Sequence, residues 1–168
     1  MSWATRDRIR WIAVAYFTLG QVYVWWQYLT ITPGASRSLP EVVVPAVAEI
    51  VVALLLACYV ILKSRSLGWV ILATMNAIVL LVLDFSIWYA SIGTTANWSP
   101  RLTRFDGLAI AMGTLTTAGA PGISPRSELA RHIITVQLVV DILAAIVLFG
   151  LLVGRLARGR ASEAPSSA

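Results

Sequence analysis

Five polar side chains lie inside long apolar stretches of the chain, where ionisable and amide groups are costly unless they face protein or water. They are Glu49, Asn76, Asp84, Gln137 and Asp141. Gln137 and Asp141 are four residues apart and therefore share one face of a helix. Two interpretations of that face stay open: it faces a water-filled path, or it hydrogen-bonds to Asn76 or to another chain. Glu49 and Asp84 have no basic partner within these stretches, and we expect structural roles for both.

The chain lacks the residue sets that enzymes and metal sites require. Its single cysteine, Cys58, lies in an apolar stretch, so no disulfide framework and no cysteine-based metal cluster can be built within one chain. No nucleophile–base–acid set, glycine-rich phosphate loop or zinc-ligand spacing is present in the sequence. We therefore expect a protein that is not an enzyme and that uses no cofactor and no metal beyond permeant cations.

The composition is typical of a membrane protein. Of the 168 residues, 58% are hydrophobic and 12% are charged, whereas soluble domains have about 25% charged residues. The net charge is +5, but the basic residues stand in short clusters beside the apolar stretches. That placement indicates membrane topology rather than a nucleic-acid-binding face. We predict an integral membrane protein that does not bind nucleic acid.

Four stretches have the roughly 20 mostly apolar residues that cross a bilayer. They are residues 9–29, 42–62, 67–90 and 133–153. Each must be helical, because the backbone has to satisfy its own hydrogen bonds in lipid. Pro45 is expected in the first turn of the second helix, where its missing N–H costs little. The predicted fold class is an all-α membrane protein with four transmembrane helices.

The positions of the basic residues orient these spans. Eight of the 13 lysines and arginines flank one side, which is therefore predicted to be cytoplasmic. They are Arg6, Arg8, Arg10, Lys63, Arg65, Arg155, Arg158 and Arg160. Both termini are then cytoplasmic, in a multi-pass protein of the plasma (inner) membrane. The same residues are placed to meet anionic lipids of the bilayer at the cytoplasmic face.

A segment between the third and fourth spans is apolar but too short to cross the bilayer. Residues 105–117 predict a half-length helix, which Thr103 can cap and whose dipole Asp106 complements. Residues 118–125 contain glycines and prolines and cannot be helical. This order predicts a re-entrant segment, whose irregular backbone survives at membrane depth only when it is buried in protein or lines a water-filled path. The alternative is an outer loop that lies on the membrane surface.

Residues 102–156 resemble the pore domain of the potassium channel family, especially its small bacterial members. The filter motif of that family, T-T-V-G-Y-G-D, corresponds to Thr116-Thr117-Ala118-Gly119-Ala120-Pro121-Gly122, with Pro125 and the pair Ala130-Arg131 after it. Residues 135–141, TVQLVVD, are similar to the T-V-Q-M-x-x-D of inner helices in actinobacterial-type channels. The resemblance extends over residues 67–156 if the third span is the outer helix, and the first two spans carry no such motif.

The resemblance implies a filter that departs from the family pattern in its outer half. Filter carbonyls in the family replace the hydration shell of K⁺. Pro121 stands at the second filter glycine and cannot adopt the positive φ that glycine permits. Ala120 replaces the aromatic residue and Gly122 the acidic residue of the motif. Thr116 to Gly119 can still form the lower part, so a shortened or wider filter with weakened K⁺ selectivity is expected.

The resemblance also implies how the chain is divided. It predicts an N-terminal two-helix membrane hairpin (1–66), a potassium-channel-like pore domain (67–156) and, from composition, a disordered cytoplasmic tail (157–168). The pore domain would contain a re-entrant pore helix, and Gln137 and Asp141 would line the cavity below the filter.

The function implied by the resemblance is passive conduction of a monovalent cation, K⁺ or Na⁺. One loop cannot enclose a pore, so the resemblance implies a homotetramer. Two alternatives stay open. The chain is a non-conducting pseudo-channel that serves as a membrane scaffold or subunit, or it is a small four-helix transporter that uses Glu49 and Asp84 as a proton site.

Overall fold

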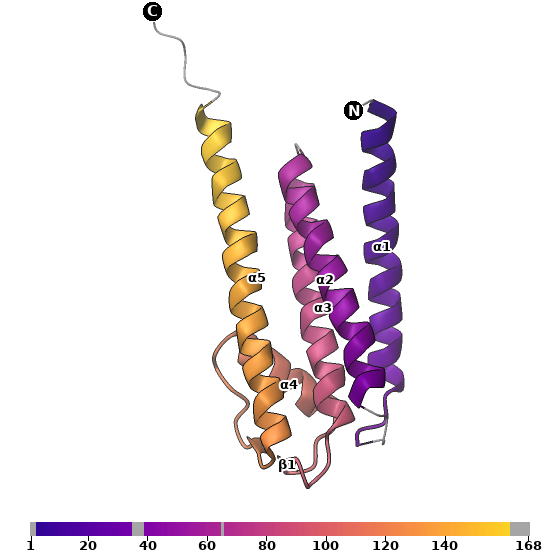
Figure 1. The fold of residues 1–168 in the computed structure, drawn as a ribbon, viewed down its shortest axis with the longest axis vertical. Coiled ribbons are helices and arrows are strands. Elements are labelled where there is room, and N and C mark those ends of the chain that lie inside the picture. Colours follow the sequence, from indigo (N-terminus) through magenta and orange to yellow (C-terminus); the bar gives the residue numbers. More distant parts are fainter. Residues whose placement is uncertain (1–2, 35–38, 65, 162–168) are drawn as a thin grey trace, which may run out of the picture.

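The structure, a computed structural model, describes residues 3–34, 39–64 and 66–161, which form four long helices, one short helix and one short strand pair. The helices are α1 (Trp3–Thr30), α2 (Leu39–Lys63), α3 (Leu67–Ser91), α4 (Arg104–Leu115) and α5 (Glu128–Ala161), and the strands are β1 (Trp98–Ser99) and β2 (Ser124–Pro125). The long helices run side by side, and short α4 lies at one end of the bundle (Figure 1). Helix α1 begins and α5 ends at the opposite end.

Three of these helices are long and apolar enough to cross a membrane. The segments are Val43–Lys63 in α2, Leu67–Ser91 in α3 and Glu128–Gly154 in α5. The prediction of a helical membrane protein is therefore confirmed at this level. Helix α1 is continuous over the predicted first span, 9–29, but it does not reach the hydropathy of the other three over the residues that the structure describes.

Helices α2 and α5 extend beyond their predicted ends. Helix α2 begins at Leu39 rather than at 42, so the placement of Pro45 in the first turn was wrong and this proline lies inside the helix. An acidic residue, Glu41, occupies the first turn and favours the earlier start. Helix α5 continues to Ala161, so residues 157–161 are helical rather than part of a disordered tail. The rest of that predicted tail, 162–168, lies outside the described residues.

Helix α3 is at the centre of the hydrophobic core. Every residue from 80 to 90 is buried, which requires neighbours on all sides of the helix. Helices α1, α2 and α4 all pack against α3. Helices α1 and α2, predicted as a hairpin, each pack more extensively against α3 than against each other. Helices from both predicted parts of the chain therefore share one core.

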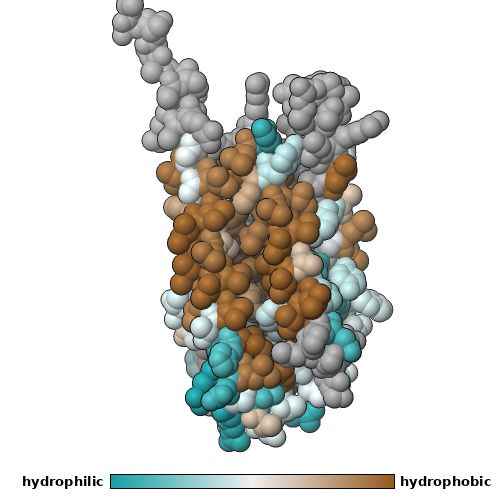
Figure 2. Space-filling model, in the orientation of Figure 1, coloured by the Kyte–Doolittle hydropathy of each residue, from teal (hydrophilic) through white to brown (hydrophobic). Residues whose placement is uncertain are grey.

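The surface of the bundle is apolar over most of its length. Figure 2 shows a broad hydrophobic band across the visible face, with hydrophilic residues gathered at the lower end. Helix α5 contributes much of the exposed apolar area, through Val139, Ile142, Ile146 and Phe149 among others. Large exposed apolar surfaces mark contacts with a membrane or with another protein, so this band agrees with a position in the bilayer.

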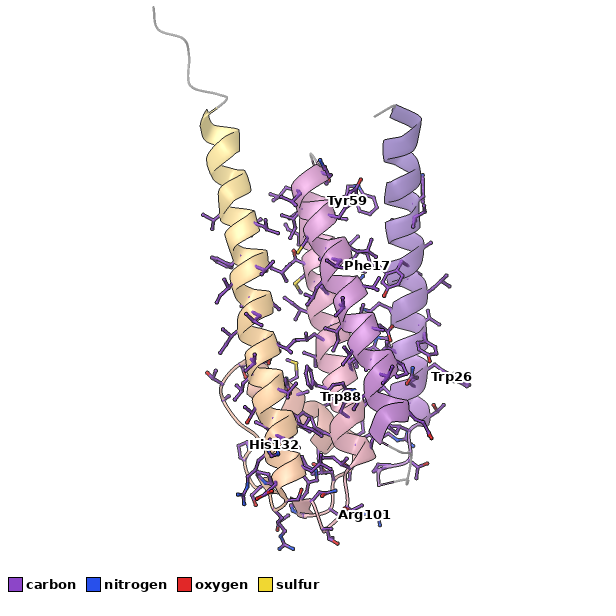
Figure 3. The ribbon with its side chains drawn as sticks, in the orientation of Figure 1. Phe17, Trp26, Tyr59, Trp88, Arg101 and His132 are labelled. Atoms are coloured by element: carbon purple, nitrogen blue, oxygen red, sulfur yellow. The ribbon has the colours of Figure 1, made fainter. Side chains whose placement is uncertain are left out.

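Two polar connections, residues 92–103 and 116–127, lie at the end of the bundle that carries α4, where Figure 3 places Arg101 of the first connection. Strands β1 and β2 pair antiparallel, with Trp98 opposite Pro125. Trp98 is 1% exposed, and its ring packs edge-on against Tyr89 with centroids 5.6 Å apart. The connections before α4 and after it are thereby joined, which holds both ends of the predicted re-entrant region.

Candidate functional site

Helix α4 begins with the capping interaction that its sequence predicts. The Thr103 hydroxyl accepts a hydrogen bond from the Asp106 N–H at 3.2 Å, and the Asp106 carboxylate accepts one from the Thr103 N–H at 2.7 Å. Both interactions together form a capping box. The half-length helix predicted over 105–117 is confirmed with bounds Arg104–Leu115. Its 12 residues are about 18 Å long, which is too short to cross a bilayer core of roughly 30 Å.

Loss of this cap should loosen the start of α4. Thr103→Ala is expected to destabilise the protein by about 1 kcal/mol, because the Asp106 N–H loses its acceptor. The free energy of unfolding, measured by SDS titration of the purified protein, checks the size of the effect. Hydrogen exchange should rise at the first turn of α4. The matched control is Thr135→Ala on the exposed surface of α5, where we expect a change within about 0.5 kcal/mol; equal effects would contradict the prediction.

A glycine brings α4 close to the central helix. A Cβ atom on Gly107 would lie 2.8 Å from the backbone oxygen of Ser86 on α3. Only a residue without a side chain permits that approach, as at other tight helix contacts in membranes. The start of α4 is also tied to α1, because the Tyr28 hydroxyl donates to the Arg104 carbonyl at 3.3 Å and the Arg104 guanidinium donates to the Leu29 carbonyl. Helix α4 is thus held by α3 and α1.

One buried side chain of α5 is hydrogen-bonded to both α3 and α4. Gln137 on α5 is 0% exposed, and its carbonyl oxygen accepts a hydrogen bond from the Tyr89 hydroxyl of α3 at 2.7 Å. Its amide nitrogen donates to the Ala111 carbonyl of α4 at 2.8 Å and to Asp141 Oδ2 at 3.2 Å. This geometry favours the helix-contact interpretation of Gln137 over the pore-lining one. The partner is not Asn76, whose Oδ1 accepts from Gln21 Nε2 at 2.6 Å.

The acidic residues of the apolar stretches lie at two different helix contacts. Asp141 is 7% exposed and lies on the face of α5 that carries Gln137; a pore-lining role for it stays a prediction. Glu49 on α2 and Asp84 on α3 are close enough to interact electrostatically with each other and with Tyr16 of α1. Asp84 is 2% exposed. The structure therefore separates the acidic pair at the α1–α2–α3 contact from the Gln137 network at the α3–α4–α5 contact.

The predicted filter, which we call the 116–122 segment, turns back onto the helix that precedes it. The Gly119 N–H donates to the Gly113 carbonyl of α4 at 3.0 Å. A Cβ atom on Gly113 would come closer than 3.0 Å to the Gly119 carbonyl oxygen, so this contact requires glycine. Thr117 and Gly119 have φ of +57° and +72°, a left-handed conformation that is uncommon for threonine. The backbone of the segment is thus bent sharply at two nearby positions.

The outer part of the segment is a β-turn. The Ile123 N–H donates to the Ala120 carbonyl at 3.1 Å, with Pro121 and Gly122 between them. Gly122 has φ of +79°, which matches the third position of a type II turn, where glycine follows proline. We did not predict this turn, although the Pro-Gly pair is a turn signal that could have revealed it. The turn occupies the positions where the family motif has its outer filter residues.

The 116–122 segment is exposed on the surface of its own chain. Most of its residues are exposed, and Ala120 is half-buried. In Figure 1 the connection from α4 to α5 passes beyond α5, on the side away from α1. The Thr116 hydroxyl donates to the Met112 carbonyl at 2.8 Å, and the Thr117 hydroxyl to the Thr116 carbonyl at 2.7 Å. Helix α4 is therefore held firmly by the rest of the chain. The backbone carbonyls of the segment that follows it accept few hydrogen bonds from the same chain.

Comparison with known proteins adds no family. No family model, no curated protein and no solved structure matches this chain. The interpretation of the 116–122 segment rests on its sequence, its exposure and its anchoring.

Proposed function

We propose that four copies of this chain form a pore-loop channel that conducts monovalent cations passively, with weakened selectivity for K⁺ over Na⁺. The exposed 116–122 segment carries this proposal. Its anchor, α4, is held by buried contacts, whereas most residues of the segment itself are exposed. Irregular backbone at membrane depth needs protein or water around it. A single chain supplies neither, and four chains around a closed axis supply both.

The proposed subunit crosses the plasma (inner) membrane four times. Helix α1 is then the first span, beside α2, α3 and α5, and α4 enters and leaves from the outer face. Helix α1 begins and α5 ends at one end of the bundle, which agrees with both termini in the cytoplasm. The eight basic residues of that side then face the cytoplasm and its anionic lipids.

Ion selectivity in the proposed channel comes from the inner part of the 116–122 segment. Carbonyl groups of Thr116, Thr117 and Ala118 would replace part of the hydration shell of the permeant ion, whereas the Gly119 carbonyl lies against Gly113 of α4 in this chain. The β-turn at residues 120–123 takes the place of the outer coordinating residues. Fewer coordinating carbonyls discriminate less between K⁺ and Na⁺, so we propose that both ions pass.

Single-channel recording tests the proposal. Purified protein in planar bilayers, with a tetramer confirmed by native mass spectrometry, is expected to conduct both K⁺ and Na⁺. Silence of a confirmed tetramer in both ions over a range of voltages would overturn conduction. A monomer or dimer as the only assembled state would overturn the architecture.

The turn at residues 120–123 also favours a second candidate, a non-conducting pseudo-channel that serves as a scaffold or subunit. A hydrogen-bonded turn at the outer mouth can close the path that an open filter would leave. The triple substitution Ala120→Tyr, Pro121→Gly and Gly122→Asp separates the two candidates. Current in the natural protein supports the channel, whereas current only in the triple variant supports the pseudo-channel.

A further inference from the structure

A cavity of about 190 Å³ lies between α3 and α5, on the side of the Gln137 network away from the loops. Its walls include Thr74, Ala77 and Leu81 of α3, and Asp141, Ala145 and Leu148 of α5. The Thr74 hydroxyl donates to the Val70 carbonyl of its own helix at 2.9 Å. Asp141 is the ionisable side chain of the lining, and the other walls are almost entirely apolar.

Asp141 has one carboxylate oxygen that is hydrogen-bonded and one that is buried without a hydrogen-bond partner among the described residues. Its Oδ2 accepts the hydrogen bond from Gln137, and Oδ1 is the other oxygen. The side chain is 93% buried, because 7% of it is exposed. No lysine, arginine or histidine from the described helices lines the cavity. Tyr89 is the other ionisable group of the network, and its hydroxyl already donates to Gln137.

An unpaired carboxylate at this depth is costly, and a cation that enters the cavity would remove that cost. A hydrated inorganic ion fits this cavity poorly. Such an ion needs several oxygen ligands, and the lining offers only this carboxylate and the Thr74 hydroxyl. A ligand with one positive charge on an apolar body matches both features. An engineered cavity of about 150 Å³ holds benzene, so the volume here suits a body of one ring with a short aminomethyl arm.

We propose that this cavity binds small hydrophobic amines, with the ammonium group on the Asp141 carboxylate and the apolar body between α3 and α5. Gln137 positions the carboxylate through its hydrogen bond to Oδ2. The ligand enters from the bilayer, where such amines concentrate. Leu115 at the end of α4 lines the cavity, but no residue of the 116–122 segment does, and the site does not depend on conduction.

The test is a ¹⁹F NMR titration of the purified full chain in lipid nanodiscs, with 4-fluorobenzylamine and the neutral 4-fluorobenzyl alcohol as probes. The amine is expected to bind at least about tenfold more tightly than the alcohol, because a charged hydrogen bond adds to the same apolar contacts. Asp141→Asn should abolish that preference and leave alcohol binding unchanged. Asp84→Asn, which changes a buried acid outside the cavity, should preserve the preference.

A second variant keeps the proposal testable if Asp141→Asn fails to fold. Ala145 lines the cavity and is exposed on α5, so Ala145→Phe fills the space without disturbing the core and should weaken both probes at least about tenfold. Equal affinity of the two probes, a preference that survives Asp141→Asn, or no binding of either probe would overturn the site. The last result would mean that a lipid chain or a neighbouring copy occupies the cavity. A silent tetramer that binds the amine would overturn conduction alone.

Discussion

Replacing Gly113 with alanine is expected to abolish conduction and to lower the free energy of unfolding by about 2 kcal/mol. The new methyl group would overlap the Gly119 carbonyl oxygen, which lies closer than 3.0 Å to the position of a Cβ atom. The neighbour is backbone rather than a flexible side chain, so relief requires the whole turn of chain to move. That movement would also break the hydrogen bond from the Gly119 N–H to the Gly113 carbonyl. Single-channel recording and SDS titration measure the two effects.

Gly150 provides the matched control for this substitution. It lies inside α5, and a Cβ atom placed on it would meet nothing within 4 Å. Gly150→Ala should therefore keep conduction, and it should gain up to about 1 kcal/mol from the better helix propensity of alanine. If Gly113→Ala matched Gly150→Ala in stability and current, the 116–122 segment would have to be free of α4, contrary to the geometry described above.

The second large effect is expected at Gln137. Gln137→Leu keeps the size of the side chain but leaves the Tyr89 hydroxyl and the Ala111 carbonyl without their Gln137 hydrogen bonds. Hydrogen bonds between membrane helices contribute about 0.6 kcal/mol on average and up to about 1.7 kcal/mol. Because Gln137 is fully buried and the substitution removes these two hydrogen bonds together with the one to Asp141 Oδ2, we expect destabilisation by about 2 kcal/mol. Hydrogen exchange in α4 should increase, because α4 is then no longer hydrogen-bonded to α5 through this side chain.

The same change on another helix controls for the loss of an amide. Gln21→Leu removes the hydrogen bond to Asn76 in a partly buried position, so it should cost about 1 kcal/mol or less and leave exchange in α4 unchanged. A double-mutant cycle isolates the contact itself. Tyr89→Phe and Gln137→Leu should be non-additive by about 1 kcal/mol, because both remove one shared hydrogen bond. Strict additivity of the two, or loosening of α4 by Gln21→Leu, would contradict the proposed linkage.

The outer half of the 116–122 segment illustrates how one pattern supports two interpretations. The motif alignment treats Pro121 as a defect in a filter, because proline cannot adopt the backbone conformation of the glycine it replaces. In the structure these residues form a regular β-turn, with Pro121 at its second position and Gly122 at its third. The departure from the filter motif and the formation of a turn follow from the same two residues. The turn could have been predicted from the conformational preferences of proline and glycine alone.

The start of α2 shows where hydropathy is a poor guide. The apolar run predicts a beginning at residue 42, but helical hydrogen bonds extend back to Leu39 through polar and proline residues. Hydropathy marks the part of a helix that can lie in lipid, and it carries no information on how far the backbone hydrogen bonds continue beyond it. The same reason explains why α5 is longer than its predicted span at both ends.

The sequence by itself determined the features that depend on neighbouring residues. Apolar length predicted α2, α3 and α5, the three helices that are long and apolar enough to cross a membrane, and the spacing of Thr103 and Asp106 predicted the start of α4, because a cap joins atoms three residues apart. Only the tertiary structure decided which polar groups meet. Gln137 contacts Tyr89 and Ala111, which are 48 and 26 residues away. Helix α5 is apolar on nearly all faces in its middle, so its hydropathy cannot set its rotation about its own axis. Packing against α2, α3 and α4 sets that rotation, and it turns Gln137 and Asp141 inward.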